Sequence, residues 1–470
     1  MNREQFRHDL RRGLGSCYAE LKQCGDPEKY RADIFWGCDH AFAYDAQSEG
    51  VRGPYLFGMI KLLGDYPDFC ELAEAGAKSN LMDTTWRFEH YISLLTLMAD
   101  AYEPASKIVW EIYQILLHEL RTGGQTQWGT WPAYDHMSYL CVLIFDDMCG
   151  TDDERAEFLL KVFSDYGDIM RMRPHLKAYL EDGWLEAHAG EVLGKNRIWK
   201  MLEENQSDPN LYCYLEQWKK NDGERRTLGQ LTPKTNTEIK TAQEIYKELQ
   251  AYDEEQEPLG MIQWTRRLEK TGDTGELTKL IEMYGTETDG QMRYRLLFVI
   301  RTKREASVFD KKGIARVISD MDSESDRLKE EAARVLSIIR DDSVRQYAID
   351  RINRGVTDID TISILIGNYQ EGDGRLLAGL IRSISADETN DFCHGMFGDI
   401  LDLIDESKEA DNELSDVLLP YLYHEGNCSG CRRRIVEHMK RRGILTLDII
   451  EQCLYDCNEE IREIASKWMG

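Results

Sequence analysis

The residues best suited to chemistry lie near the C-terminus, where four cysteines form two closely spaced pairs. Cys428 and Cys431 are three positions apart, and Cys453 and Cys457 are four positions apart. Together with the nearby His424, they provide enough soft ligands for a tetrahedral zinc site. Cys431 and Cys453 also occupy apolar positions of helical patterns, which is typical of buried thiols. Buried thiols are therefore the first interpretation of these residues, and a zinc site is the alternative.

The ten histidines form neither a catalytic nor a metal-binding pattern. His118 is followed four positions later by Thr122, where the helical zinc-protease motif requires a second histidine. Asp39-His40 lies at the end of a predicted helix, where capping and packing are commoner roles than acid–base catalysis. We therefore predict a protein that is not an enzyme and that needs no cofactor, apart from the zinc alternative.

Two stretches in the first half contain candidate binding residues. A glycine-rich stretch between two strong helical patterns contains Trp128 and Trp131, and tryptophan is enriched among the residues that dominate protein interfaces. An earlier polar stretch contains Asp45, Glu49 and Arg52. The two tryptophans would either anchor a partner or pack over neighbouring helices. The three charged residues would either line a binding groove or form capping and ion-pair contacts.

The overall charge restricts the classes of partner. The chain has 85 acidic and 58 basic residues among its 470, which gives a formal net charge of -27. Nucleic acid is bound through clustered Lys and Arg that displace counterions, and an anionic membrane surface would repel an acidic chain. The one dense basic patch, Arg432–Arg434 with Lys440–Arg442, ends at Gly443, where the dipole of a helix C-terminus favours positive charge. We therefore expect a basic protein or peptide as partner, and neither nucleic acid nor a membrane.

The sequence also lacks the features expected of a secreted, membrane-spanning or disulfide-stabilised protein. The segment Met1–Arg12 is charged throughout and lacks the apolar core of a secretory signal. The longest apolar run, Tyr139–Phe145, is far shorter than the roughly 20 residues of a membrane-spanning helix. Twelve cysteines in a chain of this length is an ordinary share, well below that of a disulfide scaffold. These features predict a cytoplasmic protein.

The elements that must position these residues are helices. Apolar residues recur at three- and four-residue spacing through most of the chain, as Ile112, Leu116 and Leu120 do. This spacing is typical of one face of an α-helix, whereas the alternation typical of a strand is scarce. Pro420 lies within one apolar segment and predicts a helix that is kinked or starts late. The sequence thus predicts an all-α fold.

Composition changes near the middle of the chain. Residues 1–235 contain most of the aromatic side chains, including eight of the ten tryptophans, whereas residues 236–470 are richer in Ile, Asp, Glu and Arg. Between them, the polar stretch Lys219–Lys240 has the composition of a linker. We therefore predict two segments, with an aromatic-rich helical segment at 1–235 and a second helical segment at 236–470.

The second segment repeats a short pattern at the start of its helices. In the last copy, Asp456 can cap a helix in which Ile461 and Ala465 face the core and Arg462 reaches toward the neighbouring hairpin. Similar helix starts occur at Met292, Leu328, Val344 and Cys431. Met292 and Leu328 are 36 residues apart, and Cys431 and Ile461 are 30 apart. A period of roughly 30–40 residues is typical of helical repeats.

This pattern resembles the HEAT-repeat family of α-solenoids, in which an acidic turn precedes an aliphatic residue, an arginine and, three positions later, an alanine. Asp342, Val344, Arg345 and Ala348 match it in full, as does the last copy, whereas Lys329 replaces the arginine in the copy at Leu328. The resemblance covers about residues 260–470 and is weaker over 1–235, where degenerate repeats are expected. It implies a right-handed α-α superhelix of helical hairpins. An irregular domain of amphipathic helices is the alternative.

The resemblance also shapes the expected function. Each repeat of a solenoid contacts only its neighbours, which creates an extended groove suited to a partner rather than a closed catalytic pocket. We therefore expect a non-catalytic interaction scaffold that binds a basic protein or peptide through an acidic surface. A DNA-repair glycosylase acting on alkylated bases, which some HEAT-like solenoids resemble, is one alternative, and it would require a basic groove. A zinc-stabilised interaction module is the other.

Overall fold

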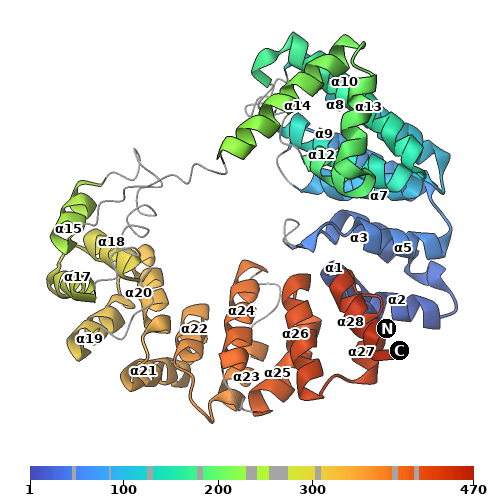
Figure 1. Cartoon of the computed structure of the whole chain (residues 1–470). Coiled ribbons are helices and arrows are strands. Elements are labelled where there is room, and N and C mark those ends of the chain that lie inside the picture. The colour runs from blue at the N-terminus through green and yellow to red at the C-terminus, as the bar shows by residue number, and fades with distance from the viewer. Residues whose placement is uncertain are drawn as a thin grey trace. The chain divides into compact units, whose positions relative to one another are not determined.

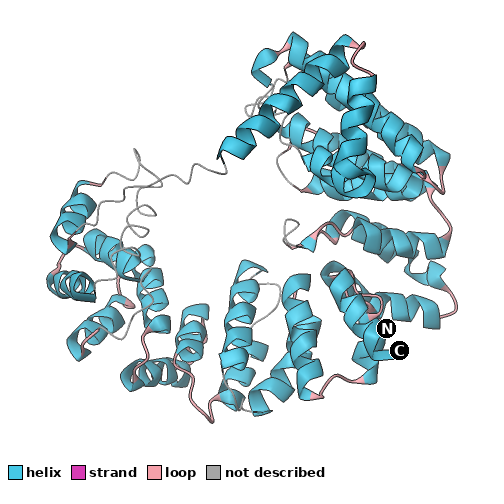
Figure 2. Ribbon diagram, viewed as in Figure 1, coloured by secondary structure: helices cyan, strands magenta, loops and turns pink. Residues whose placement is uncertain are grey.

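The computed structural model describes residues 1–44, 49–83, 86–123, 131–176, 184–228, 241–252, 274–301, 309–383, 390–406 and 412–469. Every regular element within these ranges is a helix, and no strand occurs in them (Figure 2). The prediction of an all-α fold is confirmed. Across the same ranges, no helix is both long enough and apolar enough to cross a lipid bilayer.

The chain divides into two compact units, and unit 1 contains both ends of the chain. Unit 1 consists of Met1–Pro233, Asn427–Glu437 and Leu445–Gly470, and unit 2 consists of Lys234–Gly426 and His438–Ile444. The predicted boundary at residue 235 lies next to the first change of unit. The predicted second segment, 236–470, differs from the structure, because its C-terminal residues pack with the N-terminal helices. Composition cannot reveal this division, since it depends on contacts between residues hundreds of positions apart.

Most helices of unit 1 form two layers in which each helix contacts the next (Figure 1). One layer contains α1 (Arg3–Arg12), α3 (Arg31–His40), α5 (Gly53–Leu63), α7 (Arg87–Ala99) and α9 (Trp131–Leu143). The other contains α6 (Pro67–Ser79), α8 (Glu103–Thr122), α10 (Asp152–Met172) and α14 (Pro209–Leu228). The remaining α-helices of this unit are α2 (Ser16–Gln23), α12 (Trp184–Ala189), α13 (Lys195–Glu204), α27 (Leu447–Cys453) and α28 (Glu459–Met469). Short turns are η1 (Pro27–Tyr30), η2 (Ile144–Met148), η3 (Pro174–Leu176) and η4 (Gly190–Gly194).

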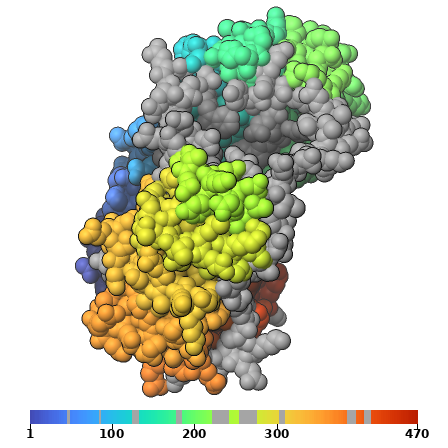
Figure 3. Space-filling view, turned by 90° about the vertical axis from the view of Figure 1, so that its left-hand side faces the viewer, coloured from blue at the N-terminus to red at the C-terminus, as the bar shows by residue number. Residues whose placement is uncertain are grey.

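Unit 2 has the same two-layer arrangement. One layer contains α18 (Gly290–Arg301), α20 (Asp326–Ile338), α22 (Ile359–Gly367) and α24 (Asn390–Glu406). The other contains α15 (Ala242–Ala251), α17 (Thr274–Thr286), α19 (Lys311–Asp320) and α21 (Asp342–Asn353). Helix α23 (Gly374–Ser383) packs on α25 (Asn412–Glu425). Figure 3 looks onto this unit, where the side chains of successive helices form a continuous surface. Helix α26 (Ser429–Arg442) begins in unit 1, and its last residues belong to unit 2.

Helix α8 illustrates how the local sequence determines where a helix begins, which face it buries and where it ends. Pro104 stands in its first turn, where the missing backbone N–H removes no hydrogen bond. Ile112, Leu116 and Leu120 are buried on one face, as their spacing predicts. Gly123 follows the helix with φ of 108°, a conformation that glycine adopts without steric cost and that ends the helix. Helix α8 therefore begins, buries one face and ends for reasons present in its own sequence.

Two local expectations differ from the structure. The predicted linker starts at Lys219, but α14 continues to Leu228. Its polar residues include Lys, Arg and Glu, which favour helices as well as linkers. Pro420 lies inside α25, so the late start is not observed, and the alternative of a kinked helix stays a prediction.

The arginines of the repeated pattern connect successive hairpins of unit 2. Arg345 Nε donates to Asp373 Oδ2 at 2.9 Å, and Arg293 pairs with Asp320. In each pair the arginine lies near the start of one helix and the aspartate lies on a later hairpin. These two ion pairs join neighbouring hairpins, as the pattern predicts for its arginine. The prediction is wrong for Arg462 in the last copy, which donates to the carbonyl oxygens of Asp456 and Cys457 in its own turn.

Candidate functional site

The first helices and the last hairpin of the chain pack together within unit 1. We call this contact, between α1 and α2 on one side and α27, α28 and the start of α26 on the other, the seam. Helix α27 packs on α2, and the Cys457 amide donates to the Gly13 carbonyl oxygen at 2.9 Å. A β-carbon at Gly13 would overlap Cys457, and one at Gly15 would overlap the backbone of Gln452. These two glycines therefore allow the chain segments to approach closely.

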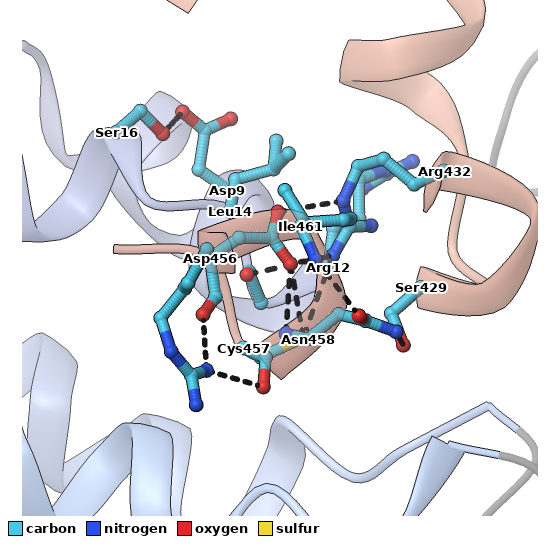
Figure 4. A network of polar contacts seen from close by, with 12 residues as sticks. Asp9, Arg12, Leu14, Ser16, Ser429, Arg432, Asp456, Cys457, Asn458 and Ile461 are labelled. Atoms are coloured by element: carbon cyan, nitrogen blue, oxygen red, sulfur yellow. Dashed lines mark hydrogen bonds and ion pairs between the residues drawn. The ribbon is translucent and has the colours of Figure 1, made fainter. Parts of the chain in front are cut away.

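A fully buried ion pair lies at the centre of the seam (Figure 4). Arg432 Nε donates to Asp456 Oδ2 at 2.8 Å, and Arg432 Nη2 donates to Asp456 Oδ1 at 3.1 Å. Asp456 Oδ1 also accepts the amide of Asn458 at 2.9 Å, and Asn458 Oδ1 accepts the amide of Ile461 at 3.2 Å. Asp456 thus neutralises Arg432 and helps to begin α28. The capping position of α28 is therefore filled by Asn458, and Asp456, predicted to cap this helix, instead accepts the amide of the capping residue.

Arg52 joins three separate parts of the chain at the seam. Its side chain is only 2% exposed. Nη1 donates to the Arg12 carbonyl oxygen at 3.1 Å and to the Cys457 sulfur, and Nη2 donates to the Asn427 carbonyl oxygen at 3.2 Å. Nη2 also pairs with Glu49 Oε2 at 3.2 Å. Glu49 and Arg52, predicted to line a groove or to form ion-pair contacts, therefore pair with each other.

Glu49 also holds the start of α26. Its Oε2 atom accepts the backbone amide of Ser429 at 2.8 Å. A carboxylate at this position satisfies an N–H group that a helix N-terminus leaves without an internal partner.

The other candidate binding residues are less completely described. Asp45 and Trp128 lie outside the described residues. Trp131 begins α9, but its side chain lies outside the described set. The proposed role of the two tryptophans as anchors therefore stays a prediction.

The four C-terminal cysteines occupy different environments. Cys428 and Cys431 lie at the start of α26, whereas Cys453 is buried within α27. Cys457 follows α27 and its sulfur accepts from Arg52 and, at 3.4 Å, from Arg432. Burial raises the Cys457 pKa to about 11, although the two guanidinium groups lower it. Within the described ranges, no group of three or more His, Cys, Asp or Glu side chains is placed to hold a metal ion.

Beside the seam, unit 1 contains a cleft of about 750 Å³. Its walls come from α2, the start of α5, α7, α9, η2 and the turn that leads into α28. Polar and charged side chains dominate the lining: Tyr18, Tyr55, Tyr139, Tyr455, Ser93, Glu49, Asp147, Asp456, Asn458, Glu459, Glu460 and Arg462. The remaining lining residues are Gly50, Val51, Pro54, Leu97, Leu143, Leu454 and Cys457.

The charges of the cleft are only partly balanced. Three of its five carboxylates are neutralised by arginines, in the pairs Glu49–Arg52, Asp456–Arg432 and Glu460–Arg433. Asp147 and Glu459 have no cationic partner in the described part of the chain. Arg462 is the only cationic side chain of the lining, and its Nη1 donates to the carbonyl oxygens of Asp456 and Cys457 at 2.8 and 3.0 Å.

Asp147 is positioned by an irregular turn. It lies in η2, a π-helical turn that continues α9, and such turns are frequent at functional sites. Thr96 Oγ1 on α7 donates to Asp147 Oδ2 at 2.9 Å. Burial, together with the neighbouring Asp146, raises the pKa of Asp147. The π-helical turn therefore holds a carboxylate in the cleft wall with a hydroxyl group, rather than a cation, beside it.

Tyrosine rings supply the other distinctive surface. Tyr18 stacks on Tyr455 with ring centroids 5.8 Å apart and meets Tyr55 edge-on at 5.7 Å. Its hydroxyl donates to the Tyr55 carbonyl oxygen at 3.0 Å. The Lys22 ammonium lies 4.1 Å from the centroid of the Tyr455 ring, which is a cation–π contact. The cleft therefore places aromatic faces close to carboxylates.

Sequence reasoning missed most of these residues. Asp147 carries no local signal, because an acidic residue after an apolar helix is common. Tyr18 and Tyr455 belong to opposite ends of the chain, so that no spacing rule connects them. Gly13 and Gly15 did offer a signal, since two glycines after a short helix favour a tight turn or a close approach.

Comparisons with known proteins do not assign the chain to a family. No protein-family model matches the chain, and no curated protein matches it. Among solved structures, the crystal structure of SYS-1 aligns with 100% of this chain and 99% of its own, at 11% sequence identity and a TM-score of 0.25. A similarity of this size supports no inference about function. What the coordinates establish is an all-α fold with helices packed in series within each unit.

Proposed function

We propose that this protein is a non-catalytic interaction scaffold of HEAT-like helical hairpins, and that the cleft of unit 1 binds a basic segment of a protein partner. One observation carries the proposal. Asp147 and Glu459 face a cleft walled by tyrosines, and neither has a cationic partner in the described residues.

The chemistry of the cleft favours a Lys or Arg side chain. Keeping a partly buried carboxylate such as Asp147 ionised costs free energy, and a cation from the partner would offset that cost. Guanidinium and ammonium groups also bind the faces of tyrosine rings. The volume of about 750 Å³ lies within the roughly 300–1,000 Å³ typical of ligand pockets. It therefore suits a few side chains of a peptide segment rather than the face of a folded domain.

The HEAT-like assignment is supported by the repeated arginines of unit 2. Arg293 and Arg345 each pair with an aspartate of a later hairpin, Asp320 and Asp373. This is the contact expected of the arginine in the repeated pattern. The alternating two-layer packing of the helices agrees with it.

The cleft does not support the two alternatives, a DNA-repair glycosylase and a zinc-stabilised module. A phosphate backbone is bound by several Lys and Arg side chains, whereas the lining has one arginine, and that arginine is engaged with carbonyl oxygens. A zinc-stabilised module would require ligands that converge, and the described residues gather no such set.

Direct titration of a basic peptide tests the proposal. A labelled peptide of alternating Arg and Gly should bind the full chain at low salt, and binding should weaken as salt screens the charges. Asp147→Asn removes one of the two unpaired carboxylates of the cleft with little change of shape and should weaken binding about tenfold, the cost of one charge-assisted contact of about 1.4 kcal/mol.

A matched control lies one residue away. Asp146 pairs with the exposed His188 and is absent from the cleft lining. Asp146→Asn should therefore leave the affinity within about twofold, because an exposed charge outside the cleft lining contributes little. If the peptide does not bind at low salt, or if the two variants weaken binding equally, the cleft is not the binding site.

A further inference from the structure

Two thiols lie together in the first turn of α26. Cys428 directly precedes the helix, and Cys431 is its third residue. The Cys431 amide donates to the Cys428 sulfur at 3.4 Å, and the Arg432 amide donates to the Cys428 carbonyl oxygen at 3.0 Å. The Cys428 sulfur therefore occupies the capping position that an oxygen of Ser or Asp usually fills.

The Cys428 sulfur lies 3.4 Å from the Cys431 backbone nitrogen, which places the two side chains in one turn. A hydrogen bond with Cys428 is the largest cause that raises the pKa of the Cys431 thiol, and burial is the next. Residues three apart in a helix have Cα atoms roughly 5 Å apart, which lies within the roughly 4.4–6.8 Å that a disulfide spans. The backbone therefore already holds this pair at a distance that a disulfide can bridge.

We propose that Cys428 and Cys431 form a dithiol that is reversibly oxidised to a disulfide by low-molecular-weight disulfides such as oxidised glutathione. The Cys428 thiolate attacks one sulfur of the oxidant, forms a mixed disulfide and releases the other half as a thiol. Cys431 then loses its proton and attacks the Cys428 sulfur, which breaks the mixed disulfide and releases the second half. Two protein thiols are oxidised, and one disulfide is reduced to two thiols.

The geometry assigns the attacking role to Cys428. Negative charge on its sulfur is stabilised by the Cys431 amide and by the dipole at the start of α26. Cys428 and Cys431 keep 5% and 8% of their surface exposed, and no other described cysteine has a second cysteine three residues away. Cys38 and Cys141 are fully buried inside unit 1, where burial raises the pKa of each thiol. We therefore expect oxidation to be selective for the pair.

The pair lies at the seam. Ser429, between the two cysteines, donates its amide to Glu49, which in turn pairs with Arg52. A disulfide would fix the turn that presents this amide. Oxidation thus acts on the contact between the start of α26 and the N-terminal part of unit 1.

Differential alkylation of the full chain tests the proposal. The reduced protein is treated with oxidised glutathione, the remaining thiols are alkylated, and peptides are identified by mass spectrometry. Cys428 and Cys431 should lose alkylation together, at least about tenfold faster than Cys38 or Cys141. The peptide that contains both should lose two hydrogens and carry no glutathione, and a reducing thiol should restore alkylation.

Single variants test the order of steps. Cys431→Ser should stop the reaction at a stable glutathione adduct on Cys428, whereas Cys428→Ser should leave Cys431 alkylatable. Cys141→Ser should leave the disulfide yield unchanged. Adduct formation is read out separately from stability, so that an altered unfolding midpoint does not obscure it. Equal alkylation of all cysteines, or a disulfide that joins a different pair, would overturn the proposal.

Discussion

The same arginine–aspartate contact occurs in both units, with very different burial. In unit 1, Arg432 and Asp456 are both completely buried. In unit 2, Arg345 and Asp373 are 24% and 6% exposed. Each arginine follows a buried residue near the start of a helix, Cys431 or Val344. The difference arises because the N-terminal helices of unit 1 pack over the first pair, and Gly13 places its carbonyl oxygen 3.5 Å from Arg432 Nη2.

Two buried glutamates show a second contrast between the units. Glu331 in α20 is fully buried and pairs with Arg301 and Arg334. Glu89 in α7 is 7% exposed and has no hydrogen-bond or ion-pair partner among the described residues. Burial and the nearby Asp135 raise the pKa of Glu89 to about 7. A buried carboxylate can therefore be stabilised as an anion in one place and favour the neutral form in another.

The largest expected effect comes from breaking the buried pair at the seam. Arg432→Met leaves Asp456 buried without its cation and should lower the free energy of unfolding of unit 1 by about 3–5 kcal/mol. Asp456→Asn should cost a similar amount, although the side-chain oxygen can still accept the amide of Asn458. Urea unfolding followed by tryptophan fluorescence measures this, since nine of the ten tryptophans belong to unit 1.

The neighbouring Arg433 provides the control. It pairs with Glu460 on the surface, where the two side chains are 38% and 61% exposed. Arg433→Met should change stability by less than about 1 kcal/mol. Equal losses for Arg432→Met and Arg433→Met would show that burial does not distinguish the two pairs.

The next effect concerns pH and Glu89. Its pKa is raised from 4.5 to about 7 in the folded chain, so the unfolded chain loses this proton at lower pH. Folding therefore carries no penalty from this group below about pH 4.5, and the penalty grows to roughly 3 kcal/mol as the pH rises through 7. Glu89→Gln should accordingly stabilise unit 1 at pH 8 and change little at pH 5.

Unfolding midpoints at several pH values measure this effect. Glu74→Gln is a suitable control, because Glu74 is on a neighbouring helix and pairs with Lys78 at the surface. If Glu89→Gln has the same effect at pH 5 and pH 8, Glu89 is ionised in the folded state and the contrast with Glu331 is wrong.

The smallest effect is expected for the partly exposed pair of unit 2. Arg345→Met should lower the free energy of unfolding by about 1 kcal/mol, because solvent screens the partly exposed Arg345 and the remaining Asp373 still accepts the amide of Gln370. Far-UV circular dichroism during urea unfolding follows the helices of both units, and tryptophan fluorescence, which reports mainly on unit 1, separates the two contributions. Lys329→Met, which removes an exposed pair with Asp326, serves as control. A loss as large as that of Arg432→Met would remove the distinction between the two units.

Much of the fold could be predicted from the sequence. The helical periodicity and the ion pairs of Arg293 and Arg345 depend on residues close together in the chain or on neighbouring hairpins. Ile461 and Ala465 are buried, as their spacing of four predicts. Local physics determines such features, because side chains three or four positions apart share one helix face whatever the rest of the chain does.

Only the tertiary structure decided the seam and the cleft. Arg52 and Cys457 meet although 405 residues separate them, and no periodicity connects positions so far apart. Asp147, Tyr18 and Glu459 line one cleft only because the last hairpin packs on the first helices. The sequence determined which faces are buried, and long-range packing determined which of the many carboxylates lack a cation.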